Sequence, residues 1–140
     1  PLSGAVLGDA VRAAAGSAAR VAVAEELDQL PVPSQVATTV HRVVTEALTN
    51  ARRHAPAATE VVVSVRVETD ELVLEVANDG LPANPRSAPG GFGIIGMAER
   101  LEMLGGSLTA GPGPGARWTV AARLPLGGED TPFDALPRGL

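Results

Sequence analysis

Apolar residues recur every three to four positions in three segments of the chain, a spacing that predicts three helices. The predicted helices cover residues 3–15, 34–54 and 93–104. Ser34 is expected to cap the longest of them, and Pro56 is expected to end it. The apolar positions of this long helix form one stripe, which consists of Val36, Val40, Val43, Val44, Ala47, Leu48 and Ala51.

Alternation of apolar and polar residues predicts five strands, because side chains of a strand point in turn to opposite faces. The predicted strands cover residues 20–26, 60–68, 71–78, 107–111 and 117–124. Short turns join the second to the third strand and the fourth to the fifth, so each pair is expected to form an antiparallel hairpin. The predicted fold class is α+β: a two-layer sandwich with a mixed, mostly antiparallel sheet of about five strands and about three helices on one face.

The length of 140 residues fits a single domain, which we expect to span residues 1–126. With 45% apolar and 19% charged residues, the chain is too hydrophobic to be disordered. Residues 127–140 show no periodicity and are expected to form a flexible tail. The chain begins at Pro1 rather than at Met, so we expect it to be a fragment of a larger protein.

Charge and composition exclude several classes of function. The net charge of −5 provides no basic surface for nucleic acid, so no nucleic-acid partner is expected. All 11 basic residues are Arg, and the absence of Lys excludes a P-loop and a Schiff base. The chain contains no Cys and therefore no disulfide or cysteine–zinc site. No apolar stretch is long enough to span a membrane, and a cytoplasmic location is expected.

The long helix carries a line of polar residues beside its apolar stripe. Glu46, Asn50 and Arg53 are spaced at i, i+4 and i+7, which places them along one line of the helix. A carboxylate, an amide and a guanidinium at the edge of a core could form a binding site. The alternative is an ordinary polar helix border with a salt bridge between Glu46 and Arg53.

Three further segments are candidates for binding. Asp79-Gly80 ends a predicted strand, where Asp79 could accept from a ligand amine or simply form a turn. Gly91-Phe92-Gly93-Ile94-Ile95-Gly96 has the GxGxxG spacing, but a long Pro- and Gly-rich loop precedes it, which excludes a dinucleotide-binding fold. Its glycines and the following helix N-terminus could still hold a phosphate. Gly113-Pro114-Gly115 is explained by a hairpin turn.

In this order, the segments resemble the motifs of the GHKL ATP-binding superfamily, which comprises gyrase, a heat-shock chaperone, histidine kinases and MutL. TEALTNARRHA resembles its N box, NDG its G1 box, GGFGIIGMAERLEMLGG its G2 region and GPGARWTV its G3 box. The chain is most similar to the catalytic ATP-binding domain of two-component sensor histidine kinases, in the subfamily that pairs with helix-turn-helix response regulators. The resemblance extends over residues 5–126.

The resemblance implies that ATP and Mg²⁺ bind, and that the γ-phosphate passes to a histidine on a separate dimerisation domain and then to a response regulator. Asn50 would coordinate Mg²⁺, and Glu46 would be the catalytic residue that orients or deprotonates a water or the phosphoacceptor. Asp79 would accept from the adenine amino group, beside Gly80, with residues 81–90 as a lid. The remaining implied ATP-binding residues are Arg53, His54, Gly91, Phe92, Gly93, Ile94, Ile95, Gly96 and Met97.

The chain departs from the family at Ala116, which occupies the usual Thr position of the G3 box. No phosphoacceptor-helix sequence surrounds His41 or His54, so the acceptor is expected elsewhere in the parent protein. The isolated domain is expected to be monomeric, and the parent to be a homodimer whose membrane anchoring stays open. Two alternatives are an anti-sigma-type protein-serine kinase, which the run ERLEMLGG argues against, and a catalytically silent nucleotide-binding module, which Ala116 would suit.

Overall fold

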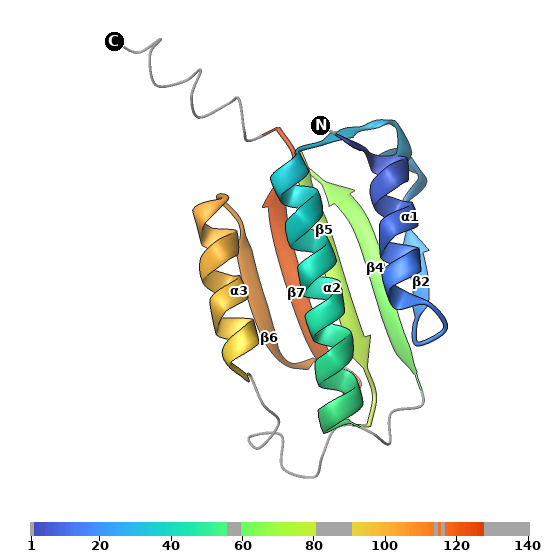
Figure 1. Cartoon of the computed structure of the whole chain (residues 1–140), viewed down its shortest axis with the longest axis vertical. Helices are drawn as coiled ribbons and strands as arrows, with labels where there is room; N and C mark the ends of the chain where they lie inside the picture. The colour runs from blue at the N-terminus through green and yellow to red at the C-terminus, as the bar shows by residue number, and fades with distance from the viewer. Residues whose placement is uncertain (1, 56–59, 81–90, 114, 116, 128–140) are drawn as a thin grey trace.

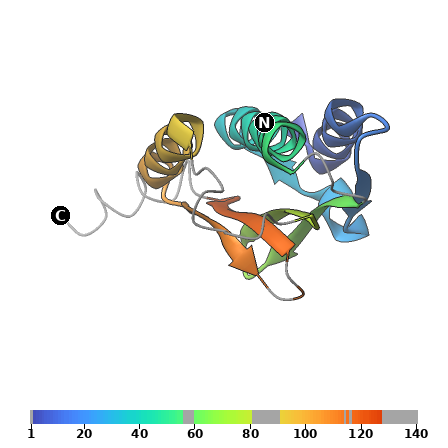
Figure 2. The same cartoon turned by 90° about the horizontal axis from the view of Figure 1, so that it is seen from below.

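The computed structural model describes residues 2–55, 60–80, 91–113, 115 and 117–127, and it has two layers (Figures 1 and 2). One layer is a five-stranded sheet, and the other consists of three helices that lie side by side over one face of that sheet. The helices are α1 (Gly4–Ala15), α2 (Ser34–His54) and α3 (Gly91–Met103). This architecture confirms the predicted α+β sandwich.

The sheet has the strand order β2-β4-β5-β7-β6. Among the described strands, β2 and β4 pair in parallel and the other neighbours are antiparallel, so the sheet is mixed as predicted. Thr69 and Asp70, with φ values of 47° and 64°, form the tight turn between β4 and β5, which matches the twist of a hairpin. The strands are β2 (Arg20–Val23), β4 (Val61–Glu68), β5 (Glu71–Asn78), β6 (Ser107–Gly113) and β7 (Arg117–Pro125).

Two short strands form a second sheet that the sequence did not predict. β1 (Leu2–Ser3) pairs antiparallel with β3 (Pro31–Val32), and neither segment was among the predicted strands. The main-chain N–H of Gly4 donates to the carbonyl of Leu30 beside this pair, at 2.8 Å. The start of α1 is thereby tied to the segment that leads into α2.

Two predictions about element ends were wrong. The strand predicted over residues 20–26 stops at Val23, and a 3-10 helix, η1 (Glu25–Gln29), follows it. This helix buries Leu27 completely while its acidic residues stay exposed, which a continued strand would not achieve. Ser34 is not the cap of α2, because Pro33 occupies the N-cap position and no side chain caps the helix.

The end of α3 follows the prediction closely. The helix begins at Gly91 rather than Gly93 and ends at Met103. Gly105, with φ at 84°, donates its N–H to the carbonyl of Glu102, and Gly106 donates to that of Leu101. These are the bonds of a glycine-terminated helix, in which the left-handed residue satisfies the last carbonyls.

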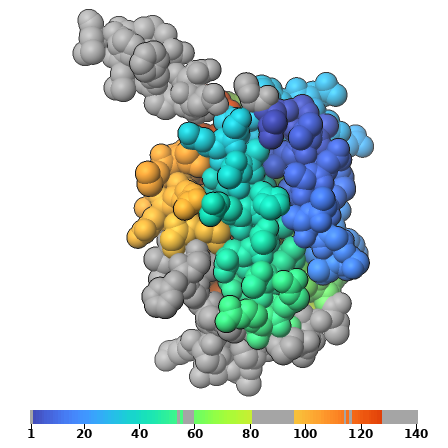
Figure 3. All heavy atoms as spheres, in the orientation of Figure 1, coloured from blue at the N-terminus to red at the C-terminus, as the bar shows by residue number. Residues whose placement is uncertain are grey.

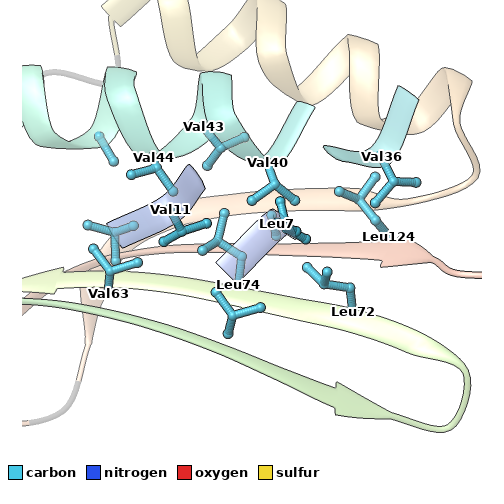
Figure 4. Packing of buried hydrophobic residues seen from close by; sticks show 14 of the residues in the cluster. Leu7, Val11, Val36, Val40, Val43, Val44, Val63, Leu72, Leu74 and Leu124 are labelled. Carbon is cyan, nitrogen blue, oxygen red and sulfur yellow. The ribbon is translucent and has the colours of Figure 1, made fainter. Parts of the chain in front are cut away.

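The core lies between the two layers. Every residue of the stripe predicted for α2 is buried. Figure 4 shows side chains of α2 directed at leucines of β5 and β7, among them Leu72, Leu74 and Leu124. Because one side of α2 packs against the sheet in this way, the line of polar residues beside the stripe is held at the edge of the core. Within the described part of the chain, no helix is both long and apolar enough to cross a lipid bilayer.

Candidate functional site

The fold brings the predicted site residues to one end of the sandwich. The C-terminal end of α2, the end of β5 and the beginning of α3 all lie at the lower end of the molecule in Figure 1. In Figure 3, α2 runs down the middle of the helix layer, with α1 on one side and α3 on the other. The predicted lid, residues 81–90, lies outside the described residues, as does Ala116.

A hollow of about 350 Å³ lies between α2 and α3. We call it the α2–α3 hollow; it is lined by His41, Arg42, Thr45, Glu46, Gly96, Met97 and Arg100. Three of these residues, Glu46, Gly96 and Met97, were predicted as site residues on two separate motifs. This volume lies within the usual range for small-molecule pockets.

Of the polar line of α2, Glu46 lines this hollow whereas Asn50 and Arg53 do not, and the salt bridge that we considered is not formed. Glu46 and Asn50 are half-buried and Arg53 is exposed. Glu46 forms no ion pair with any described residue, Arg53 included. A carboxylate that lines a hollow without such a pair can accept a proton or orient a nucleophile within it.

Sequence reasoning missed two arginines of the hollow. Arg42 lies one helical turn before Glu46, and Arg100 lies one turn after Gly96. Guanidinium groups are suited to binding phosphate, and in a chain without Lys they are the side chains able to provide permanent positive charge. Spacing along α2 could have suggested Arg42, but Arg100 is found only once the packing of α3 against α2 is known.

The oxygen donors on α2 suit a magnesium ion whose other ligands are phosphate oxygens of a substrate. The described residues contain no group of three or more His, Asp or Glu side chains able to hold a metal by themselves. Asn50 and Glu46 offer oxygen donors one turn apart on the same helix. Mg²⁺ commonly takes only one or two protein ligands together with substrate phosphates, so this small donor set suits it.

The end of β5 is fixed by bonds to the residue before β4. The N–H of Glu60 donates to Oδ1 of Asp79 at 3.0 Å, and the N–H of Asp79 donates to the carbonyl of Glu60 at 3.3 Å. Gly80 follows with φ at 78°, a left-handed conformation that glycine adopts without strain. Asp79 and Gly80 therefore mark the point where the chain leaves the sheet.

Charges surround Asp79 on the side of the sheet away from the helices. The carboxylate of Glu60 is hydrogen-bonded by Arg117, and this bond, together with the charges of Arg117 and Arg20, lowers the pKa of Glu60 below 4.5. The pKa of Arg117 is raised by the bond to Glu60 and by its charge, with a smaller contribution from Asp79. Asp79 thus lies close to both partners of this ion pair.

Asn78 is a further candidate site residue, which the sequence analysis did not single out. It is 4% exposed, and the alternation along β5 places it on the helix-facing side, with Leu74 and Val76. Its Nδ2 donates to the carbonyl of Asp79 at 2.8 Å. Its Oδ1 accepts from no described residue, and none of the fully buried side-chain oxygens of the described chain lacks a partner. This oxygen is therefore accessible, and the alternation of β5 could have revealed it.

The other predicted residues are placed only in part. His54 is the last residue of α2, and Gly91, Phe92, Gly93, Ile94 and Ile95 form the beginning of α3. The side chains of these residues lie outside the part of the structure that can be described. Their helical positions nevertheless put the last turn of α2 and the first turns of α3 at the same end of the molecule (Figure 1).

Comparison with known proteins gives a consistent result. Residues 35–128 match the family described as histidine kinase-, DNA gyrase B-, and HSP90-like ATPase. The chain is 36% identical over 94 residues to the sensor histidine kinase YxjM of Bacillus subtilis, which covers 67% of this chain and 22% of that protein. It is 34% identical over 95 residues to the kinase/phosphatase UhpB of Salmonella typhimurium, which covers 68% of this chain and 19% of the relative. The chain thus spans about a fifth of the length of these relatives.

Solved structures give the same picture. The histidine kinase domain of the Erythrobacter litoralis EL346 blue-light activated histidine kinase superposes with a TM-score of 0.65 at 28% identity, over 91% of this chain and 63% of that one. The histidine kinase domain of the E. coli osmosensor EnvZ has a TM-score of 0.63 at 20% identity, over 88% of this chain and 85% of that one. The second likeness bears on the fold alone.

Proposed function

Since this chain belongs to the histidine kinase-, DNA gyrase B- and HSP90-like ATPase family and is the ATP-binding catalytic domain of a sensor histidine kinase, we propose that it phosphorylates a histidine. The acceptor lies on a separate dimerisation domain. The observation that carries the proposal is the α2–α3 hollow, which Glu46 lines from α2 and Gly96 and Met97 line from α3. The hollow therefore has a carboxylate that can accept a proton on one side. On its other side is the glycine-rich helix, which suits a phosphate.

In the proposed reaction, the bond between the γ-phosphorus and the bridging oxygen of ATP breaks as a bond to the histidine nitrogen forms. Glu46 takes or orients the proton that leaves this nitrogen, and ADP departs. Asn50 would hold Mg²⁺, which when bound neutralises phosphate charge. Arg53, His54 and the first turns of α3 would contact the phosphates, and Arg42 and Arg100 add positive charge in the hollow. Catalysis would be mostly positioning and charge stabilisation.

The adenine amino group would be bound at the end of β5, beside Gly80. We predicted Asp79 as its acceptor, and this stays a proposal. Asn78 is a second candidate, favoured by its helix-facing position and its accessible Oδ1. An amide oxygen accepts from an amino group as a carboxylate does, so either residue could distinguish adenine from a base that carries an oxygen at the same position.

The proposed partners follow from the same reaction. They are ATP, a dimerisation domain that carries the phosphoacceptor, and a response regulator of the helix-turn-helix type. We propose that the isolated domain is a monomer, that the parent is a homodimer, and that the domain works in the cytoplasm. Residues 1–126 would form the domain and residues 127–140 a tail.

The proposal is tested by calorimetric titration of the domain with ATP, with and without Mg²⁺. We expect saturable binding that Mg²⁺ strengthens, and transfer of phosphate to the dimerisation domain of a related kinase supplied in trans. Asn50→Asp should keep the adenine contacts but lose most of the metal-dependent transfer, because its negative charge changes how Mg²⁺ and the phosphates are held. Gln35→Glu, the same amide-to-carboxylate change at an exposed position of α2, is the matched control.

Each result decides between the stated alternatives. Binding without transfer to any histidine domain would favour a catalytically silent nucleotide-binding module. Transfer to a serine of a protein partner would favour the anti-sigma type. Absence of binding at millimolar ATP and Mg²⁺ would contradict the proposal.

A further inference from the structure

We propose that Glu60 is a positioning residue that holds the base-binding end of β5 in place, with Arg20 and Arg117 as its anchors. The inference rests on the proposed function insofar as Asn78 or Asp79 binds the base. Glu60 itself touches no reacting atom and belongs to none of the motifs that the sequence analysis singled out.

The carboxylate of Glu60 connects β2 with β7, which are not neighbours in the sheet. Its Oε2 accepts from Nη2 of Arg20 at 2.6 Å, and its Oε1 accepts from Nη2 of Arg117. Arg20 begins β2 and Arg117 begins β7, and the strand order places β5 between β4 and β7. The two ion pairs therefore span the end of β5, where Asp79 lies.

The main chain of Glu60 transmits this anchoring to the base-binding residues. Its N–H donates to Oδ1 of Asp79, and its carbonyl accepts the N–H of Asp79. The carbonyl of Asp79 in turn accepts from Nδ2 of Asn78. A continuous series of bonds thus runs from the two arginines, through Glu60 and Asp79, to the amide that faces the helix layer.

This position needs support because the sheet ladder stops there. The last regular pair of the two strands is Val61 with Asn78, and Glu60 lies one residue beyond it. Beyond that pair, Glu60 and Asp79 exchange two hydrogen bonds, one through Oδ1 of Asp79 and one between the main chains. Bonds at the end of a ladder open more readily than those within it, so an anchored partner restricts the orientation of both side chains.

The ion pairs are too exposed to serve mainly as a source of stability. Side-chain exposure is 34% for Arg117, 35% for Glu60 and 73% for Arg20. Exposed pairs contribute little to the free energy of unfolding because solvent screens them. Their effect should therefore be local, on the geometry of Asp79 and Asn78.

The opposite end of β4 offers a matched control. Glu68 also bridges two arginines, since it accepts from Nε of Arg66 at 2.7 Å and from Nη2 of Arg123 at 3.2 Å. Its exposure of 43% is similar to that of Glu60. Glu68 lies at the far end of the strand from Asp79, so Glu68→Gln removes the same chemistry without touching the base-binding end.

The test compares the wild type, Glu60→Gln and Glu68→Gln by calorimetric titration with ADP and with IDP, whose base lacks the amino group. We expect Glu60→Gln to weaken ADP binding about threefold to tenfold and to reduce the preference for ADP over IDP. Glu68→Gln should change neither value, and the thermal unfolding midpoints of the two variants should be similar. An unchanged preference in Glu60→Gln, or an equal loss in both variants, would overturn the inference.

A second measurement does not depend on nucleotide. In Glu60→Gln, the main-chain amide of Asp79 should exchange with solvent faster, and the NMR signals of the Asn78 side-chain amide should shift. Neither change is expected in Glu68→Gln. If the wild type bound no nucleotide, the proposed function would fail, whereas these amide signals would still show whether Glu60 holds the end of β5. Unchanged signals would overturn the positioning role in either case.

Discussion

The side-chain amide of Asn78 donates from Nδ2 to the main-chain carbonyl of Asp79, 2.8 Å away, so the two neighbours use their side chains in different ways. Because Nδ2 of Asn78 donates to the main chain, Oδ1 is the atom of this amide that can accept a hydrogen bond on the helix-facing side. Asp79 instead commits Oδ1 to the N–H of Glu60. The proposal for base binding therefore has two versions, with either Asn78 or Asp79 as the acceptor, and mutations can distinguish between them.

We predict that Asn78→Ala weakens ADP binding more than Asp79→Asn does. Loss of a buried hydrogen-bonding group costs about 1–3 kcal/mol, which corresponds to roughly 5- to 150-fold in affinity. Asp79→Asn keeps an acceptor for the N–H of Glu60 and should lose less. The measurement is calorimetric titration with ADP, alongside thermal unfolding of each variant. A large loss in Asp79→Asn with normal binding by Asn78→Ala would instead support the original assignment to Asp79.

Local patterns predicted most of the fold correctly. The stripe of α2 and the hairpin of β4 and β5 follow from side-chain periodicity, because one face of each element must pack against the other layer. The two-residue strands β1 and β3 carry no periodicity and arise from contacts distant in sequence. The strand beginning at Arg20 was predicted too long because burial of Leu27 overrides the alternation that continues past Val23.

The site was predicted less completely, and the missed residues differ in how far local patterns could reveal them. Glu46, Gly96 and Met97 belong to motifs that the resemblance covers, and the structure places them around one hollow. Arg100 reaches that hollow only because of how α3 packs against α2, which no local pattern specifies. Asn78, by contrast, could have been found from the sequence, because the alternation along β5 directs it towards the helices.

Glu46→Gln should separate binding from transfer. The amide keeps the size of the side chain but cannot take a proton, so transfer to a histidine domain supplied in trans should fall about 10²- to 10⁴-fold. Affinity for ADP should stay close to that of the wild type, because the proposed contacts of Glu46 are made during transfer. Glu102→Gln, an exposed change on α3, is the control. Normal transfer by Glu46→Gln would remove Glu46 from the proposed catalytic role.

Gly96→Ala should move stability and binding in opposite directions. Gly96 is exposed within α3, and a Cβ there would meet no atom within 4 Å. Alanine is favoured over glycine in helices by about 1 kcal/mol, so the free energy of unfolding should rise. The added methyl group would project at the α2–α3 hollow, and ADP should bind more weakly. Thermal unfolding and calorimetry measure the two effects, and equal or tighter binding would place the nucleotide elsewhere.

Gly106→Ala and Gly111→Ala should differ strongly although both lie close to or within β6. A Cβ on Gly106 would lie 2.1 Å from the carbonyl oxygen of Arg123, whereas one on Gly111 would meet nothing within 4 Å. Because the backbone must shift to admit the first methyl group, Gly106→Ala should lower the free energy of unfolding by about 1–3 kcal/mol. Gly111→Ala should be neutral or slightly stabilising. Chemical denaturation checks this, and equal stability of the two variants would contradict the close approach.

The charge network on the outer face of the sheet should make stability depend on pH. Hydrogen bonds from Arg66 and Arg123, together with the charge of Arg66, hold the pKa of Glu68 below its ordinary value of 4.5. A carboxyl whose pKa is lower in the folded state stabilises the fold above its unfolded pKa, and this contribution disappears as the pH falls through the folded value.

The difference in unfolding midpoint between the wild type and Glu68→Gln should therefore be present at pH 7 and vanish as the pH is lowered well below 4.5. High salt at neutral pH should reduce the same difference, since the pairs are partly exposed. Glu102→Gln, which removes a carboxylate that is not ion-paired with any described residue, controls for the change in net charge. A difference that grows on acidification would mean that protonation of Glu68 is favoured by folding, contrary to the bonds from Arg66 and Arg123.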